Sequence, residues 1–414
     1  MSEREFDIVL MGATGFTGRL VAEHLLRRHG VGGELNWALA GRSREKLEKI
    51  RIELGETAAG LPLVIADSHD RESLDAMVQR TRVVCTTVGP YALHGSELVA
   101  ACAENGTDYC DLSGEVPWMR RMLDSHADSA AKSGARIVHC CGFDSIPSDM
   151  GVWFLQREAA ERLGKPLSRV RMRVKAAKGG LSGGTYASML NIVEEARRDK
   201  EVARVLKNPY ALCPPEAREG ERQPYVSGAN FDSAFNVWTA PFIMAAINTR
   251  VVLKANALSG HSYGRDFRYD EAVMTGRGFS GRMKATSVSL GMGAFALGAA
   301  LGPTRSLLKK MVLPKPGEGP SAEQREAGFF KIVIDGRNAG DDQSLRVSVS
   351  GDRDPGYGST SKMLGETALA LARDLPADAC PGGIWTPSTA LGERLLERLT
   401  QHAGLEFKVV DSAS

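Results

Sequence analysis

Three glycines, each three residues from the next, follow the first apolar run of the chain. The run at 6–11 leads into Gly12, Gly15 and Gly18, and an amphipathic helical pattern begins at Arg19. A strand, a glycine turn and a helix in this order hold a dinucleotide pyrophosphate, because glycine permits the tight turn and the helix N-terminus offers free N–H groups. The alternative is a loop that only needs the positive φ of glycine. The residues expected to bind the phosphates are Gly12, Thr14, Gly15, Phe16, Thr17 and Gly18.

The end of the next predicted strand bears on the choice between NAD and NADP. That strand, at 35–40, is followed by Gly41, Arg42, Ser43 and Arg44, where an NAD-selective site carries an acidic residue for the ribose 2′-hydroxyl. A guanidinium matches phosphate oxygens, so Arg42, helped by Ser43 and Arg44, predicts NADP(H) as the cofactor. The alternative is an exposed basic helix start with Ser43 as its N-cap.

Strands and helices alternate over the first 150 residues. Further strands are predicted at 61–66, 82–88, 109–112 and 136–141, and helices at 98–103 and 119–131. This alternation predicts a Rossmann-type, doubly wound parallel sheet with ligands at the carboxyl ends of its strands. Asp67 follows the third strand and is expected at the adenine, unless it caps a helix instead. Gly89 and Pro90 follow the fourth strand and are expected beside the ribose and the nicotinamide.

Tyr91 and His94 are the candidate catalytic residues, because they come directly after the fourth strand. A phenol or a neutral imidazole there is able to donate a proton; the alternative is that Tyr91 packs and His94 caps a helix. Asp144, after the strand at 136–141, faces the same rim. The Tyr-x-x-x-Lys relay of short-chain dehydrogenases is absent from the sequence, since Tyr357 and Lys362 miss that spacing by one residue.

Composition excludes several classes of protein. A chain of 414 residues is long enough for two domains, and its net charge of +2 argues against nucleic acid as a partner. Its 7 scattered cysteines form no Cys-x-x-Cys pair, so neither a metal site nor a disulfide framework is expected. The polar N-terminus runs at once into the first strand, which predicts no signal peptide and a cytoplasmic protein.

The strand–helix rhythm fades after Met150. The run at 169–175 alternates basic and apolar residues, so its basic face is either solvated or a dock for an acidic carrier protein, the latter through Arg171 and Arg173. A glycine-rich loop at 179–185 precedes a helix at 186–198 and suits either an anion or a capping turn. Further along, strands are predicted at 329–335 and 344–350, as partners in a hairpin, and helices at 362–374 and 387–399.

Residues 285–304 carry no charge, and basic residues flank them. The stretch is barely long enough to span a membrane, so three interpretations stay open: a buried core helix, a lining for an acyl chain, or a contact with a membrane surface. Residues 315–320 are a linker by composition.

The expected architecture is therefore α/β, in two domains and a tail. Residues 1–150 form a dinucleotide-binding Rossmann domain, and 151–375 form an α+β substrate domain with a mixed or antiparallel sheet. The segment 376–414 is expected to pack back on the first domain.

Several motifs resemble the saccharopine dehydrogenase-like oxidoreductases. They are Val-Gly-Pro-Tyr-x-x-His-Gly at 88–95, Gly-Thr-Asp-Tyr-Cys-Asp-Leu-Ser-Gly-Glu at 106–115, Cys-Gly-Phe-Asp-Ser-Ile-Pro-Ser-Asp at 141–149 and Gly-Gly-Ile-Trp-Thr-Pro-x-x-Ala-Leu-Gly at 382–392. Within that family the chain looks most like the mycobacterial trans-acting enoyl reductases. The resemblance implies NADPH-dependent reduction of a carbon–carbon double bond on a lipid or polyketide acyl chain, delivered by a carrier protein during lipid and glycolipid synthesis.

Two other functions stay open at this point. One is a saccharopine-type dehydrogenase acting on an amino-acid-derived secondary amine. The other is a non-enzymatic, membrane-associated protein that binds the cofactor. A peripheral position at the inner face of the plasma membrane and a homodimer are compatible with each of these functions.

Overall fold

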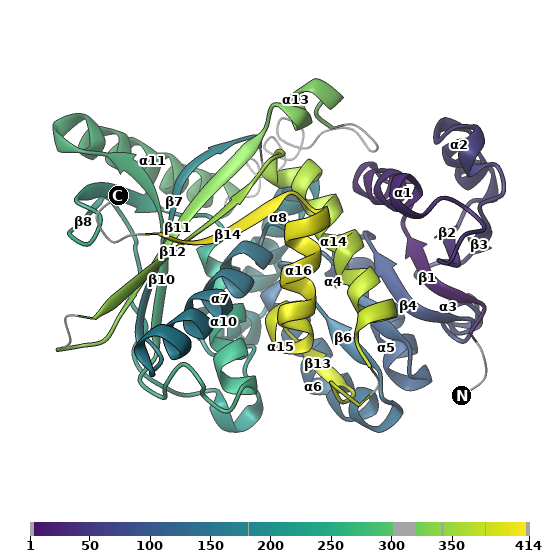
Figure 1. Ribbon diagram of the computed structural model, residues 1–414, viewed down its shortest axis with the longest axis horizontal. Coiled ribbons are helices and arrows are strands. Elements are labelled where there is room, and N and C mark those ends of the chain that lie inside the picture. Colours follow the sequence, from purple (N-terminus) through teal and green to yellow (C-terminus); the bar gives the residue numbers. More distant parts are fainter. Residues whose placement is uncertain (1–3, 181, 301–318, 341–342, 377, 411–414) are drawn as a thin grey trace.

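Two seven-stranded sheets organise the chain, one on the right of Figure 1 and the other on the left. The computed structural model describes residues 4–180, 182–300, 319–340, 343–376 and 378–410. The first sheet has the order β13-β6-β5-β4-β1-β2-β3 with parallel neighbours throughout, which confirms the predicted doubly wound sheet. Its strands are β1 (Phe6–Met11), β2 (Trp37–Gly41), β3 (Leu63–Ile65), β4 (Thr81–Thr86), β5 (Asp108–Cys110), β6 (Arg136–Val138) and β13 (Gly383–Trp385).

Every residue of β1 is buried, because this strand lies between β2 and β4 and is covered on both faces. That position explains why the first run of the sequence is continuously apolar rather than alternating. The helices that connect and cover the sheet are α1 (Phe16–His29), α2 (Arg44–Glu53), α3 (Arg71–Val78), α4 (Tyr91–His94), α5 (Ser96–Asn105), α6 (Val116–Ser133) and α7 (Ile146–Leu163), with a short turn η1 (Glu56–Ala58).

The second sheet is mixed, with the order β14-β12-β11-β7-β10-β9-β8. Strands β7 and β10 run parallel, and the other neighbours are antiparallel, including the predicted hairpin of β11 and β12. Its strands are β7 (Arg169–Lys178), β8 (Asn230–Asp232), β9 (Val237–Pro241), β10 (Arg268–Gly276), β11 (Phe329–Arg337), β12 (Ser344–Gly351) and β14 (Leu405–Val410). The remaining helices are α8 (Gly183–Arg198), α9 (Lys200–Lys207), η2 (Pro215–Ala217), α10 (Ala245–Leu258), α11 (Gly278–Ala300), α13 (Ala322–Glu326), η3 (Pro355–Ser359), α14 (Thr360–Leu369), η4 (Ala370–Asp374), α15 (Pro387–Leu391) and α16 (Glu393–His402).

The last part of the chain is shared between both sheets. Strand β13 extends the first sheet beside β6, whereas β14 pairs with β12 in the second. The helix expected at 387–399 is two helices, α15 and α16, because Gly392 has φ 49° and turns the chain between them. Of the apolar run at 285–304 and the linker at 315–320, residues 301–318 lie outside the described part.

The basic face expected on β7 is solvated only in part, because Lys175 is exposed whereas Arg173 is not. The Arg173 side chain is buried and forms ion pairs with Asp232 at 2.6 Å and Asp270 at 2.6 Å. Arg171 lies 3.5 Å from the same Asp232. Strand β7 is an inner strand between β11 and β10, so this charge is neutralised within the fold and Arg173 is not available to an acidic partner.

A buried carboxylate joins three helices on the outer face of the first sheet. Glu366 of α14 is hydrogen-bonded to His24 of α1 at 2.8 Å, and lies 3.1 Å from Arg28 and 3.0 Å from Arg398 of α16. Burial raises the pKa of Glu366, but the hydrogen bond from His24 and the neighbouring cations outweigh it and leave the pKa below its ordinary value.

We expect Glu366→Gln to lower the free energy of unfolding by about 3 kcal/mol, because it leaves the buried His24 and the half-buried Arg28 without their carboxylate partner. A depressed folded-state pKa stabilises the protein above the unfolded pKa, about 4.3, and this stabilisation is lost as the pH falls through the folded value. The difference between wild type and variant in denaturant titrations should therefore shrink in acid. Glu201→Gln is the control, since Glu201 pairs with Arg204 on the surface. Equal unfolding midpoints for Glu366→Gln and wild type at neutral pH would contradict this role.

Candidate functional site

The turn between β1 and α1 accepts only glycine at two of its positions. Gly12 has φ +91°, and a Cβ at Gly18 would lie 2.2 Å from the carbonyl oxygen of Gly12. Helix α1 therefore begins pressed against the turn. Its N-cap, Gly15, has no side chain to cap the first N–H groups of the helix. An uncapped helix N-terminus behind a glycine turn fits the pyrophosphate of a dinucleotide.

Arg42 lies at the carboxyl edge of the first sheet with neither a hydrogen bond nor an ion pair to another described residue, and it is exposed. Ser43 caps α2 by accepting a hydrogen bond from the Lys46 backbone. Asp67 is at the same edge, where it accepts a hydrogen bond from the His69 backbone. An unpaired guanidinium at this edge fits a 2′-phosphate.

The two candidate catalytic residues are separated. Tyr91 lines a cavity that lies where the two halves of the molecule meet. Its hydroxyl donates to the Thr86 carbonyl oxygen at 3.3 Å and accepts from the Leu112 N–H at 3.1 Å. Burial, then the charge of Asp111, raises the pKa of Tyr91 well above its ordinary value. His94 is not among the described residues that line the cavity. It lies 2.9 Å from His69, and burial together with the charges of His69 and Arg42 lowers its pKa.

Glu115 holds the turn that follows β4. Its buried carboxylate accepts hydrogen bonds from the backbone N–H groups of Tyr91 at 2.7 Å and Ala92 at 3.0 Å, and from the Ser188 hydroxyl at 2.8 Å. Burial is the largest influence on the pKa of Glu115 and raises it. Through Ser188 of α8, this carboxylate ties the Gly89–Pro90 turn of the first sheet to the wall of the cavity.

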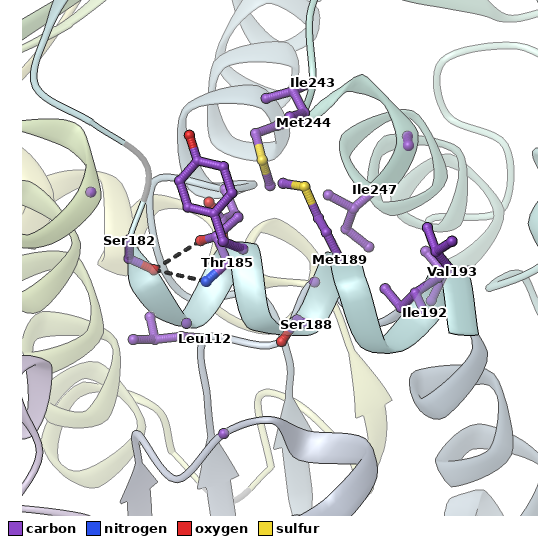
Figure 2. Close-up of a pocket in the computed structure, with 18 of the residues that line it drawn as sticks. Leu112, Ser182, Thr185, Ser188, Met189, Ile192, Val193, Ile243, Met244 and Ile247 are labelled. Carbon is purple, nitrogen blue, oxygen red and sulfur yellow. Dashed lines mark hydrogen bonds between the residues drawn. The ribbon is translucent and has the colours of Figure 1, made fainter. Parts of the chain in front are cut away.

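A cavity of about 690 Å³ lies where the two halves of the molecule meet. Its lining includes Thr17 at the start of α1 and Thr87 and Gly89 after β4, all at the carboxyl edge of the first sheet. Helix α8 crosses it, as Figure 2 shows, and Met189 of α8 points toward Met244. The other described apolar residues of α8, α10 and α11 that line it include Ile192, Val193, Ile247, Val288, Met292 and Phe295.

The second glycine-rich loop ends at the polar side of this cavity. Ser182 caps α8, accepting from the Thr185 N–H at 3.0 Å, and the hydroxyls of the two residues lie 2.9 Å apart (Figure 2). The Gly183 N–H donates to the Tyr357 hydroxyl at 2.9 Å, and the Tyr357 ring packs edge-on against Phe16 of α1. The N-termini of α1 and α8 are thereby held beside one another through η3.

Two charged side chains, Asp144 and Arg250, line the cavity in the described part of the chain. Burial raises the pKa of Asp144 to about 7 and lowers that of Arg250 to about 10. The Arg250 guanidinium donates to the carbonyl oxygens of Leu206 and Asn208, and so caps the C-terminus of α9. Arg250 thus has a structural use that Asp144 lacks.

Helix α11 lies along the edge of the molecule, at upper left in Figure 1, and is apolar on two faces. Its inner face, with Val288, Met292 and Phe295, lines the cavity. Its outer face leaves four large apolar side chains exposed: Phe279, Met283, Leu290 and Leu297. Within the described residues, no helix is both long enough and apolar enough to cross a membrane.

The sequence placed the turns of the first sheet along one edge, and a lining for an acyl chain was one of the interpretations open for 285–304, but nothing in it predicted the parts of the wall that α8 and α10 supply. Met189, Ile247 and Met292 come from three different helices, and their spacing in the sequence carries no sign that they meet. The glycine-rich loop at 179–185 and the uncharged run at 285–304 were the local signals for this wall.

Comparison with known proteins agrees with this geometry. Residues 8–138 match the model of the saccharopine dehydrogenase NADP binding domain. A Mycobacterium tuberculosis H37Rv protein, Rv2449c, which bears the name trans-acting enoyl reductase provisionally, is 44% identical over 99% of both chains. The trans-acting enoyl reductase of Mycobacterium ulcerans is 38% identical over 97% of both.

Among solved structures, the L-Glu-forming saccharopine dehydrogenase of Saccharomyces cerevisiae has a TM-score of 0.52 at 11% identity, covering 98% of this chain and 99% of its own. At that identity it is informative about the fold alone. The full-length relatives carry the assignment further: the chain is an NADP(H)-binding member of the saccharopine dehydrogenase-like oxidoreductases and belongs to the family of the mycobacterial trans-acting enoyl reductases.

Proposed function

We propose that the protein reduces a carbon–carbon double bond of an acyl chain with NADPH. The observation that carries this proposal is the cavity, whose cofactor end at Thr17, Thr87 and Gly89 continues directly into an apolar wall. A site of this shape holds an extended apolar substrate with one end at the nicotinamide. The names of the relatives as enoyl reductases point to the same reaction class.

The cofactor would lie along the carboxyl edge of the first sheet. The turn of Gly12, Gly15 and Gly18, with Thr14, Phe16 and Thr17 around it, would hold the pyrophosphate at the N-terminus of α1. Arg42, with Ser43 and Arg44, would bind the 2′-phosphate, and Asp67 would lie at the adenine. Gly89 and Pro90 would flank the nicotinamide, which supplies the hydride when NADPH is bound.

The acyl chain would run along α8. From Ser182 to Val193 this helix advances about 16 Å, from hydroxyl-bearing residues at its N-terminus to aliphatic ones. A thioester carbonyl would sit at the polar end, where Ser182 and Thr185 offer hydroxyls and the helix dipole favours developing negative charge. The hydrocarbon tail would then occupy the apolar end beside Met189 and Ile192.

The alternative of a saccharopine-type dehydrogenase is less well supported by the lining. A substrate with amino-acid head groups carries several carboxylates, which need basic partners. Arg250 is the one cation among the described lining residues, and three backbone carbonyls already engage it. In this proposal Tyr91 and His94 are neighbours of the turn that would hold the nicotinamide, and no catalytic step is assigned to either.

The direct test is to mix the purified protein with NADPH and 2-enoyl thioesters of increasing chain length. We expect NADPH oxidation together with a product two mass units heavier, seen by mass spectrometry. Oxidation only with a 2-oxo acid and an amino acid would instead identify an amine-forming dehydrogenase. Binding of NADPH without turnover of either substrate class would favour a non-enzymatic role.

Arg42→Ala tests the choice of cofactor. Removing a guanidinium from a phosphate should weaken NADPH binding by about 30-fold, equivalent to about 2 kcal/mol, and leave NADH binding unchanged. Calorimetric titration of both nucleotides gives the two dissociation constants. An equal loss for both would contradict the phosphate role. Lys49→Ala, which removes an exposed cation farther along α2, is the matched control for general loss of positive charge.

Ile192→Trp tests the position of the acyl chain. An indole at the apolar end should shorten the cavity, lowering kcat/KM for long-chain enoyl thioesters by about tenfold while sparing short ones. Ile192→Leu, which conserves volume, is the control. A uniform loss over all chain lengths would contradict the proposed path.

We also propose that the outer face of α11 rests on an anionic lipid surface. Its exposed apolar side chains lie beside Arg277, Arg282 and Lys284, and α11 contains no acidic residue. Arg282 stacks on Trp238, which adds an aromatic side chain at the rim. Apolar, aromatic and basic residues in this arrangement are typical of helices that lie in a membrane interface.

Leu290→Glu should therefore reduce co-sedimentation with phosphatidylglycerol vesicles several-fold, because it places a negative charge in the centre of this face. Glu406→Gln, on the distant strand β14, should not change it. The lipid contact would be refuted if Leu290→Glu bound vesicles as well as wild type does. It would also be refuted if the wild-type protein formed dimers and did not bind vesicles.

A further inference from the structure

The loop that carries Asp144 is fixed on both sides of that residue. The Phe143 N–H donates to the Thr360 hydroxyl at 3.0 Å, and the Ser145 hydroxyl donates to the Asn248 side-chain oxygen at 3.0 Å. Asn248 in turn donates to Glu271 at 2.9 Å. At Gly142 a Cβ would lie 2.8 Å from Leu112, so the backbone is also closely packed. Asp144 is thus held by neighbours while its own side chain lines the cavity.

Its carboxyl group differs from the fully buried carboxyl groups of the protein, since Asp144 is half-buried and lines the cavity. Asp149 accepts hydrogen bonds from Ser388 at 2.7 Å through both its N–H and its hydroxyl, and Glu271 accepts from Asn248 and from the Tyr269 hydroxyl. Glu115 accepts three hydrogen bonds. Over the described ranges, the Asp144 carboxyl has neither a hydrogen-bond nor an ion-pair partner. A partnerless acid aimed at a cavity is unusual, because burying it costs stability unless it is neutral.

We propose that Asp144 is the proton donor of the reduction. It lines the same cavity as Thr17, Thr87 and Gly89, and it follows β6 at the carboxyl edge of the first sheet as Gly89 follows β4. The reacting carbons of the substrate would lie at this edge, next to the nicotinamide. This inference rests on the proposed function. It assigns the second half of the reaction to a residue of this chain.

The step balances as follows. The hydride that NADPH supplies would form a C–H bond at the acyl β carbon. The π-electron pair of the carbon–carbon double bond would then move toward the thioester oxygen. The O–H bond of the Asp144 carboxyl then breaks, and its proton joins the α carbon as the carbonyl reforms. The carboxylate left behind takes a proton from water, so NADPH and one proton are consumed for each saturated acyl group.

A general acid must be protonated at working pH, and the surroundings favour this state. Burial holds the pKa of Asp144 at about 7. The titratable groups that line the cavity with it are Tyr91 of α4, Tyr186 of α8 and Arg250 of α10, and Cys140 from its own connection lies near it. Tyr91 is already bonded through its hydroxyl, whereas Tyr186 packs edge-on against Phe295 on the apolar side. Activity should therefore be full below about pH 7 and fall as pH rises through that value.

The experiment compares wild type, Asp144→Asn and Glu271→Gln. Glu271 is the matched control, because burial raises its pKa to about 7 as well, but it lies outside the described cavity lining and is fully hydrogen-bonded. NADPH affinity is measured by calorimetry, and kcat for an enoyl thioester is measured as a function of pH. The titration of the carboxyl groups is followed by 13C NMR of protein labelled at aspartate and glutamate.

We expect Asp144→Asn to bind NADPH as wild type does, to lose about 100-fold in kcat, and to lose both the alkaline fall in kcat and one aspartate titration near neutrality. Glu271→Gln should keep that alkaline fall and that aspartate signal. The assignment would be overturned if kcat of Asp144→Asn still fell at alkaline pH, or if that fall were lost in Glu271→Gln or in Tyr186→Phe. A wild-type spectrum in which no aspartate titrates near neutrality would overturn it as well. If Asp144→Asn does not fold, a wild-type kcat that is constant from weakly acid to alkaline pH overturns it equally. A wild type that binds NADPH yet reduces no enoyl thioester refutes the proposed function itself.

Discussion

The contact between Gly18 and the carbonyl oxygen of Gly12 governs the layout of the whole site. It allows α1 to start within van der Waals distance of the turn after β1, so the uncapped N–H groups of the helix point along the edge of the first sheet. A side chain at either position would push α1 away from this turn. Every other element of the site is positioned relative to this edge.

The second half of the molecule is tied to this edge by a small number of polar contacts. Tyr357 bridges Phe16 of α1 and the N-terminus of α8, and Glu115 bridges the Gly89–Pro90 turn and Ser188 of α8. Both contacts lie at the polar end of the cavity. The N-terminus of α8 is therefore held against the turns that follow β1 and β4, and the later turns of the helix present apolar side chains to the cavity.

The sequence was sufficient to predict the parallel sheet, because the features that specify such a sheet lie in consecutive residues. A fully buried strand such as β1 must be apolar throughout, and the turn after it requires glycine, so both leave a mark in consecutive residues. The burial and ion pairing of Arg173 could not be predicted in this way. Its partners Asp232 and Asp270 come from β8 and β10, far away in the sequence, and an alternating basic strand has the same pattern whether or not such partners exist. The same limit applies to the helix expected at 387–399, where a glycine within a regular apolar stripe gave no warning that the chain turns there.

The apolar helix α11 illustrates why three interpretations of one stretch stayed open. Amphipathicity separates a core helix from a surface helix only when one face is polar. In α11 the inner face meets the cavity and the outer face is exposed, and both are apolar, so the pattern contains no periodic contrast to read. A helix that must line an acyl cavity on one side and contact lipid on the other would have this composition. If the proposed lipid contact holds, the lack of contrast follows from two apolar environments, one on each side of the helix, rather than from a buried position.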